Sequence, residues 1–291
     1  MRKTKLFMLL GATLLLAPVA SCGNATNYDN EKLVIGMECG YQPFNWTENS
    51  SNDYTLPIFG TNQFADGYDI AVARYLSQDL GKEVVIKKIE WDSLIPSLMN
   101  GDINMVLAGM SVTTERLKSI DFSDPYLASD LAFLIKSENL PEGNSKDNPA
   151  SYEQLKQLFN GQNLVCQANV VGDDIIDTYF SSQEGYNIHH NAPLSTYPLA
   201  AQDVKSGLAF AMPAELPVVE AMTNLGGLSV LYCDYRSFLS EDDITGLAVN
   251  VGLKKGNDEL RQQINASLAK LTQAQRSTMM GEASQRSASN A

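Results

Sequence analysis

Histidine and cysteine are scarce in this chain, which limits the metal chemistry available to it. Its 291 residues include two histidines and four cysteines, and no two cysteines form a C-x-x-C pair. His189 and His190 are adjacent, so in a strand their rings point to opposite faces and give no metal-ligand geometry. The sequence therefore predicts no metal site, and it contains no cofactor fingerprint.

Positive charge is also sparse. Lysine and arginine together number 21 against 34 aspartates and glutamates, and the formal net charge is −13 at pH 7. No run of lysine and arginine offers a face that could follow a phosphate backbone. We therefore expect no nucleic-acid partner, and we interpret the acidic surface as a source of solubility. The length suits two domains of ordinary size.

The N-terminus contains an apolar run, residues 6–20, which is too short for a transmembrane helix of about 20 residues. Three cations, Arg2, Lys3 and Lys5, precede this run. A positive stretch followed by a short apolar run is typical of an export signal.

Val19-Ala20-Ser21-Cys22 ends this region and resembles a bacterial lipobox. The resemblance implies that residues 1–22 are a lipoprotein signal peptide, cleaved before Cys22, and that lipid is attached to this cysteine. An ordinary cleaved signal is the alternative. Residues 23–31 are interpreted as a polar tether. We expect an exported protein that its lipid anchors in the membrane on the extracytoplasmic side, in the periplasm or at the cell surface.

Three cysteines, Cys39, Cys166 and Cys233, remain if Cys22 is lipidated. Because three is an odd number, at least one of them is a free thiol or pairs outside the chain. We expect buried, inert cysteines by default.

Strand and helix patterns alternate in the first half of the chain. Val72, Leu76 and Leu80 repeat at helical spacing, and Asp92 and Gly101 supply a helix cap and a left-handed stop. The predicted elements are a strand at 33–37, a helix at 69–80, a strand at 83–89, a helix between Asp92 and Gly101, and a strand at 103–108. This order is typical of a sheet with helices on its faces.

The second half repeats this order after a polar segment that contains proline and glycine. Its predicted elements are a strand at 132–136, a helix at 151–159, a strand at 163–167, a helix at 174–180 and a β run at 228–233. This run, or the run at 247–253, is expected to return the chain to the first domain. The tail at 284–291 lacks a core pattern, and we expect it to fray.

The loop from Gly109 to Thr114 is rich in small and hydroxyl-bearing residues and leads into a predicted helix. Unpaired N–H groups at a helix start, the Ser111 hydroxyl and the planar fork of Arg116 together favour an anion such as a carboxylate. The alternative is that Arg116 is a solvated surface charge beside ordinary helix caps.

Three stretches carry a family resemblance. They are WDSLIPSLMNGDINMVLAGMSVTTERLKSIDFSDPY at 91–126, LVIGMECGYQPF at 33–44 and VNVGLKKGNDELRQQINASLAKL at 249–271. The first, with its GMSVTTER and DFSDPY blocks, resembles the signature of the bacterial extracellular solute-binding proteins of family 3, the polar amino-acid receptors of ABC importers. The resemblance covers roughly residues 33 to 270.

This resemblance implies an α/β fold of the type II periplasmic-binding-protein kind, with two lobes joined by a two-strand hinge. Each lobe would be a mostly parallel sheet flanked by helices. Lobe 1 would comprise 32–131 plus 237–291, and lobe 2 would be inserted at 132–236. The unusually long connection at 46–66 departs from the family, and we expect an excursion near the cleft rim.

The resemblance also implies how the main-chain end of an amino acid would be held. Arg116, with Gly109 and Ser111, would hold the carboxylate, and Glu215 would pair with the ammonium. The family usually has aspartate at the position of Glu215, and the alternative for Glu215 is a solvent-exposed acid. Asn169, Val170 and Val171 form the loop where the family usually carries glycine and threonine. The carboxylate would lose two hydroxyl partners there, although backbone N–H groups could still donate.

Tyr41 and Trp91 would sandwich the aliphatic part of the ligand, and Glu38 would face its side chain. The alternatives are a half-buried packing tyrosine, a core tryptophan and a loop carboxylate in water. Two acids in one cleft favour a polar or basic ligand.

We therefore expect a monomeric, lipid-anchored binding protein that is not an enzyme and that delivers an amino acid to a membrane permease. Two alternatives stay open. One is a dehydratase-like enzyme for small carboxylic acids on the same fold, with Glu38 or Glu215 as a general acid. The other is the ligand-sensing lobe of a signalling system.

Overall fold

The structure is a computed structural model that describes residues 32–289. The predicted signal peptide, the lipidation at Cys22 and the tether at 23–31 lie outside the described residues, so they stay predictions. Within the described part, no helix is both long and apolar enough to cross a membrane.

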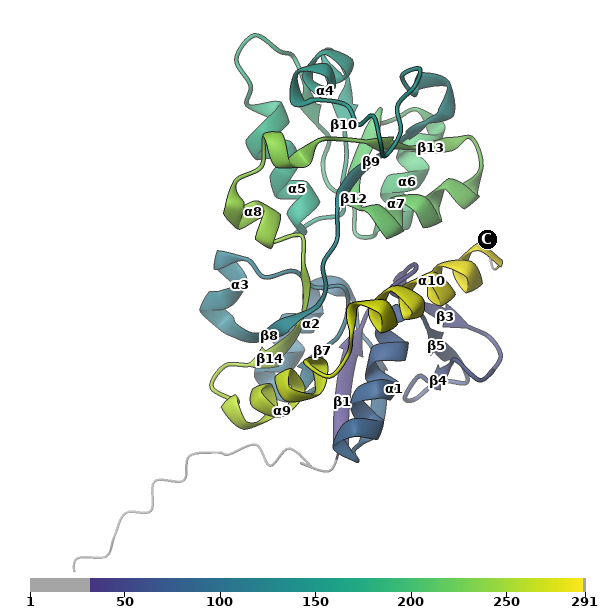
Figure 1. The fold of residues 1–291 in the computed structure, drawn as a ribbon, viewed down its shortest axis with the longest axis vertical. Helices are drawn as coiled ribbons and strands as arrows, with labels where there is room; N and C mark the ends of the chain where they lie inside the picture. The colour runs from purple at the N-terminus through teal and green to yellow at the C-terminus, as the bar shows by residue number, and fades with distance from the viewer. Residues whose placement is uncertain (1–31, 290–291) are drawn as a thin grey trace, which may run out of the picture.

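Two five-stranded sheets form the centres of two lobes that lie one above the other (Figure 1). The strands of the lobe 1 sheet are, in spatial order, β6 (Glu83–Lys88), β1 (Lys32–Met37), β7 (Met105–Val106), β14 (Val249–Lys254) and β8 (Ile120–Leu127). Those of the lobe 2 sheet are β11 (His189–His190), β10 (Asn163–Leu164), β12 (Ala211–Glu215), β9 (Leu131–Lys136) and β13 (Leu228–Tyr232). The predicted two-lobe α/β architecture is confirmed.

Each sheet is mixed rather than mostly parallel. In lobe 1, β1 runs parallel to β6 and β7, whereas β14 runs antiparallel to β7 and β8. In lobe 2, β10 is parallel to β11 and β12, whereas β9 is antiparallel to β12 and β13. The chain leaves lobe 1 between β8 and β9 and returns to it on β14. These crossing strands are the ones that run antiparallel to their neighbours.

The crossings between the lobes decide which β run returns to lobe 1. β13 belongs to the lobe 2 sheet and β14 to the lobe 1 sheet. The run at 247–253 therefore returns the chain to lobe 1, and the run at 228–233 does not. Both β9 and β14 are buried along almost their whole length, which explains the continuous apolar sequence of β9 and the mostly apolar sequence of β14. The predicted lobe boundaries at 131 and 237 stay predictions.

The long segment at 46–66 forms most of a third, small antiparallel sheet. Its strands are β2 (Gly40–Tyr41), β3 (Asn45–Glu48), β4 (Leu56–Pro57) and β5 (Phe64–Asp66). Trp46 and Ile58 are buried in the core. The segment is therefore a folded part of lobe 1 and not only a surface connection.

Helices cover the sheets and carry several site residues. They are α1 (Tyr68–Leu80), α2 (Trp91–Asn100), α3 (Thr114–Ser119), α4 (Tyr152–Phe159), α5 (Val171–Ile176), α6 (Tyr197–Ser206), α7 (Leu216–Met222), α8 (Glu241–Thr245), α9 (Asp258–Leu268) and α10 (Gln273–Ser289). A one-turn π-helix at Asp177–Ser181 continues α5.

A local signal predicted where α2 ends, but the start of this helix needs a correction. Gly101 ends α2 in the left-handed conformation at φ 87°, as expected. Asp92 was expected to cap this helix, but α2 begins one residue earlier at Trp91 and Asp92 lies in its first turn. An acid there still suits the helix dipole.

The tail is expected to fray, but its described residues, 284–289, are part of α10. Arg286 donates to the Asp66 carboxylate at 2.8 and 2.9 Å, and Asp66 is only 1% exposed. Ser287 is buried, and α10 contacts both α1 of lobe 1 and α7 of lobe 2. A buried ion pair, which needs no apolar periodicity, therefore holds this helix in place.

Candidate functional site

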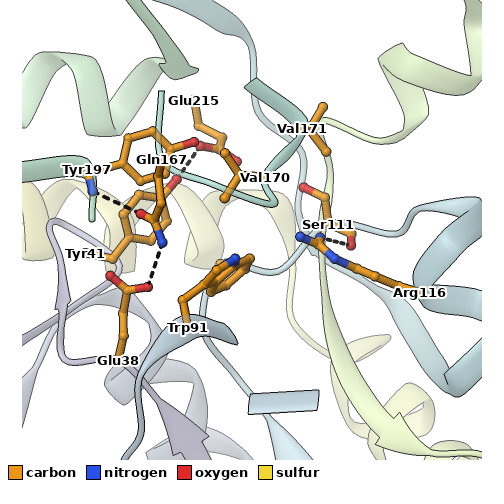
Figure 2. Close-up of a pocket in the computed structure, with 11 residues that line it drawn as sticks. Glu38, Tyr41, Trp91, Ser111, Arg116, Gln167, Val170, Val171, Tyr197 and Glu215 are labelled. Carbon is orange, nitrogen blue, oxygen red and sulfur yellow. Dashed lines mark hydrogen bonds between the residues drawn. The ribbon is translucent and has the colours of Figure 1, made fainter. Parts of the chain in front are cut away.

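One cavity between the lobes contains all nine predicted ligand-binding residues (Figure 2). Its lining residues are Glu38, Tyr41, Trp91, Gly109, Ser111, Arg116, Gln167, Val170, Val171, Tyr197 and Glu215. The cavity is narrow, about 10 Å³, which is room for roughly one water molecule. A molecule larger than water enters this cavity only if the residues that line it move.

Both lobes place these residues at strand ends. Glu38 follows β1 and Gly109 follows β7 in lobe 1, whereas Gln167 follows β10 and Glu215 ends β12 in lobe 2. The carboxyl ends of strands are where open α/β sheets bind ligands. The two sheets therefore present their binding ends to each other across one cavity.

Arg116 is a buried cation, 9% exposed, and not a solvated surface charge. Its Nη1 donates to the carbonyl of Ser111 and its Nη2 to the carbonyl of Asn169, both at 2.7 Å. Its guanidinium carbon lies 5.2 Å from the centre of the Trp91 ring. Burial lowers the pKa of Arg116, although a guanidinium stays charged in proteins. Among residues 32–289, Arg116 forms no ion pair with a carboxylate.

A buried polar network supports the loop at Gly109. The Gly109 N–H donates to the Tyr126 hydroxyl at 2.9 Å, and this hydroxyl donates to Asp69 at 2.7 Å. Asn45 donates to the same carboxylate at 2.8 Å and accepts from the Cys39 N–H at 2.8 Å. Burial raises the pKa of Asp69 to about 7. The network joins the two site loops of lobe 1 through one carboxylate.

Gly109 itself allows no side chain. Its φ is +61°, and a Cβ atom there would lie 2.7 Å from the Tyr41 ring. Glycine therefore lets the loop and the Tyr41 ring share one wall of the cavity.

Glu38 is buried at the lobe 1 side of the cavity, 9% exposed. Its Oε2 accepts from Gln167 Nε2 at 3.4 Å, whereas its Oε1 is buried without a hydrogen-bond partner. Burial raises the pKa of Glu38 to about 7. Gln167 in turn accepts from the Tyr197 N–H at 3.0 Å. Glu38 is therefore not a loop carboxylate in water.

Glu215 is likewise buried, 9% exposed, and accepts a hydrogen bond from the Tyr41 hydroxyl across the cavity. Burial raises the pKa of Glu215. The Tyr41 ring stacks on Phe44 and Tyr197, with centres 5.2 and 4.9 Å apart. The solvent-exposed alternative for Glu215 is therefore wrong.

Sequence reasoning missed Gln167 and Tyr197. Gln167 lay inside a predicted strand, but β10 ends three residues earlier, at Leu164. Tyr197 begins α6, which was not predicted, although Thr196 caps it and Pro198 stands in its first turn. A threonine cap followed by an early proline is a helix-start signal that points to Tyr197.

No cysteine or histidine among the described residues lines this cavity. Cys39, Cys166 and Cys233 are free and buried. His190 Nε2 lies 3.0 Å from Asp173 Oδ1, and His190 Nδ1 lies 2.8 Å from Asp177 Oδ1. In the described part of the chain, no group of three or more His, Cys, Asp or Glu side chains is arranged to hold a metal ion.

Two binding proteins are similar to this chain in sequence. The glutamine-binding protein GlnH of Bacillus subtilis (strain 168) is 26% identical over 252 residues, 84% of this chain and 77% of that protein. The L-cystine-binding protein TcyJ of Escherichia coli (strain K12) is 31% identical over 243 residues, 82% of this chain and 77% of that protein.

A solved structure shares the fold. It is an amino acid ABC transporter substrate-binding protein, AbpA from Streptococcus pneumoniae, bound to L-arginine. Its TM-score is 0.70 at 21% identity, covering 89% of this chain and 96% of that one. Residues 33–280 match the model of a family described as bacterial extracellular solute-binding proteins, family 3. The chain belongs to this family.

Proposed function

We propose that this protein is the substrate-binding component of an ABC importer and binds a polar or basic amino acid between its two lobes. The observation that carries the proposal is Arg116. A guanidinium has five N–H donors, and main-chain carbonyls take two of the bonds that Arg116 can make. A ligand carboxylate satisfies the remaining donors and adds a counter-charge in direct contact with a buried cation.

Glu215 is the partner for the ammonium group. A carboxylate accepts about four hydrogen bonds, so Glu215 can accept from both Tyr41 and a ligand ammonium. Arg116 and Glu215 line the same cavity and carry opposite charge. This arrangement suits a zwitterion and disfavours a simple carboxylic acid, which offers Glu215 no cation.

Glu38 and Gln167 would receive the ligand side chain. The buried, unpartnered Oε1 of Glu38 needs a hydrogen-bond donor. An amide or a cationic group supplies one, and a cation also favours the charged form of this carboxylate. The similarity to a glutamine-binding protein and to an arginine-bound structure supports the same class of ligand.

Binding would couple to closure of the lobes. The narrow cavity has walls from both sheets, so the full set of contacts exists only in the closed state. The closed complex would dock on a membrane permease, with the protein held at the extracytoplasmic surface by lipid on Cys22 and acting as a monomer. Val170 and Val171 would form an apolar wall where the family offers a hydroxyl.

One observation keeps an enzyme as the second candidate. Glu38 is a buried carboxyl with a pKa of about 7, which suits a general acid acting on a small carboxylic acid. Turnover of cyclic hydroxy acids by the purified protein, lost in Glu38→Gln, would favour this candidate. Amino-acid binding without turnover would favour the receptor.

Thermal unfolding against the twenty amino acids, polyamines and short peptides tests the receptor. A ligand that binds only the folded protein stabilises it by about 2.7 kcal/mol at one hundred times its dissociation constant. We expect one polar or basic amino acid to raise the midpoint, and Arg116→Ala to abolish the shift. Arg261→Ala, which removes an exposed arginine on α9, is the control, and we expect it to retain the shift in the midpoint. An unchanged shift in Arg116→Ala contradicts the proposed site.

A further inference from the structure

Asn169 of lobe 2 makes three polar contacts with lobe 1 beside the cavity. Its carbonyl accepts from Arg116 Nη2 at 2.7 Å and from Trp91 Nε1 at 3.3 Å. Its side-chain Nδ2 donates to Asp92 Oδ1 at 3.0 Å. Asn169 lies between β10 and α5, whereas its partners belong to α2 and α3. A single residue therefore bridges the two lobes.

These contacts lie at the wall between two cavities. Trp91 and Arg116 line both the narrow ligand cavity and a second cavity of about 390 Å³, to which Asn169 also contributes. The carbonyl of Asn169 holds the two side chains that separate these spaces. Releasing this carbonyl would let the wall open toward the larger cavity.

The direction of the carbonyl depends on the backbone of Asn169. Its φ is +61°, in the left-handed region, and Val170 after it is extended at φ −117°. Asparagine and glycine adopt the left-handed conformation readily, whereas alanine disfavours it by about tenfold in population. The bond to Asp92 is solvent-exposed and contributes less than the partly buried carbonyl contact.

We infer that Asn169 is the latch that holds the lobes closed, acting through its main-chain carbonyl on Arg116. The inference rests on the proposed function in one respect: the same guanidinium would hold the ligand carboxylate and the latch. A carboxylate that orders the guanidinium also orders the donor to Asn169. Ligand binding and closure are thereby coupled through one side chain.

Trp91 reports directly on this latch. The chain has two tryptophans, and Trp46→Phe leaves Trp91 as the only tryptophan. In this background, stopped-flow fluorescence with L-glutamine and with L-arginine gives association and dissociation rates for Asn169→Gly and Asn169→Ala. We expect dissociation to accelerate about tenfold in Asn169→Ala and at most about threefold in Asn169→Gly, with association changed less than twofold.

The order of the two variants separates the latch from a side-chain role. Both variants lose the amide that contacts Asp92, but only alanine disfavours the left-handed backbone. Dissociation that is equally fast in both variants, or faster in Asn169→Gly, overturns the inference. Asn191→Ala is the matched control, because Asn191 also belongs to lobe 2 and bonds a main-chain carbonyl, that of Leu208. We expect Asn191→Ala to leave the association and dissociation rates unchanged.

A second readout works without a ligand. If no amino acid binds the protein, the proposed function fails but the latch is still measurable by acrylamide quenching of Trp91. Quenching that rises in Asn169→Ala and stays near the parent value in Asn169→Gly supports the latch. Equal quenching in the parent and in both variants overturns it. Thermal unfolding confirms that each variant is folded.

Discussion

Tyr41 and Glu215 form a hydrogen bond inside the cavity although 174 residues separate them in the sequence. Tyr41 belongs to the small sheet of lobe 1 and Glu215 ends β12 of lobe 2. The bond therefore exists only while the lobes are closed. It also gives the buried Glu215 carboxylate a donor, which a buried charge requires.

Tyr41→Phe is expected to destabilise the closed, ligand-free protein by about 1–3 kcal/mol, because it leaves the buried Glu215 carboxylate without its donor. Urea unfolding measures this change. Tyr186→Phe removes a hydroxyl that bonds Glu153 at the exposed surface, so it should cost less than about 0.5 kcal/mol. Equal losses of stability in the two variants would show that the buried Tyr41–Glu215 bond stabilises the protein no more than an exposed bond does.

Stability is expected to fall as pH rises from 4.5 to 7. Burial raises the pKa of Glu38 from 4.5 to about 7, so the folded protein binds more protons than the unfolded chain in this window. The charged carboxylate then costs the folded state on the order of 3 kcal/mol above pH 7.

Glu38→Gln should reduce this pH dependence, measured by urea unfolding at pH 5, 6 and 7. Burial also raises the pKa of Asp69, to about 7, and the pKa of Glu215, so these two carboxyl groups have the same sign and keep the remaining slope. Glu184→Gln, at an exposed position, is the control. A slope that Glu38→Gln leaves intact would mean that Glu38 is not desolvated.

Tyr126→Phe is expected to weaken ligand binding about tenfold, because the Gly109 N–H loses its acceptor and the loop loses its link to Asp69. Titration calorimetry measures the affinity. Tyr68→Phe is a close control: Tyr68 stacks on Tyr126 and donates to its carbonyl at 2.9 Å, but it does not bond Gly109. Equal losses of affinity in both variants would contradict a specific role for the network.

Arg286→Ala is expected to destabilise the protein by about 3–5 kcal/mol, because Asp66 is left as a buried charge without its partner. Arg261→Ala breaks an exposed pair with Asp258 and should cost less than about 1 kcal/mol. Thermal unfolding compares the two. A small effect of Arg286→Ala would mean that α10 is held by its other contacts.

Local sequence determined the elements whose causes are local. Gly101 predicted the end of α2 because a left-handed stop needs only a glycine. The apolar run at 132–136 predicted the strand β9, and burial of this strand in the structure accounts for the pattern. The family motif located Arg116 and its loop, and these residues line the cavity together with the other predicted ones.

Tertiary structure decided what depends on residues distant in the chain. The tail has no apolar periodicity, yet Arg286 meets Asp66 from 220 positions away and fixes α10. Gln167 and Tyr197 join the site because lobe 2 faces lobe 1, and the left-handed Asn169 carbonyl finds Arg116 for the same reason. Such contacts leave no local pattern, because each partner is chosen by the closed arrangement of two sheets rather than by its neighbours in sequence.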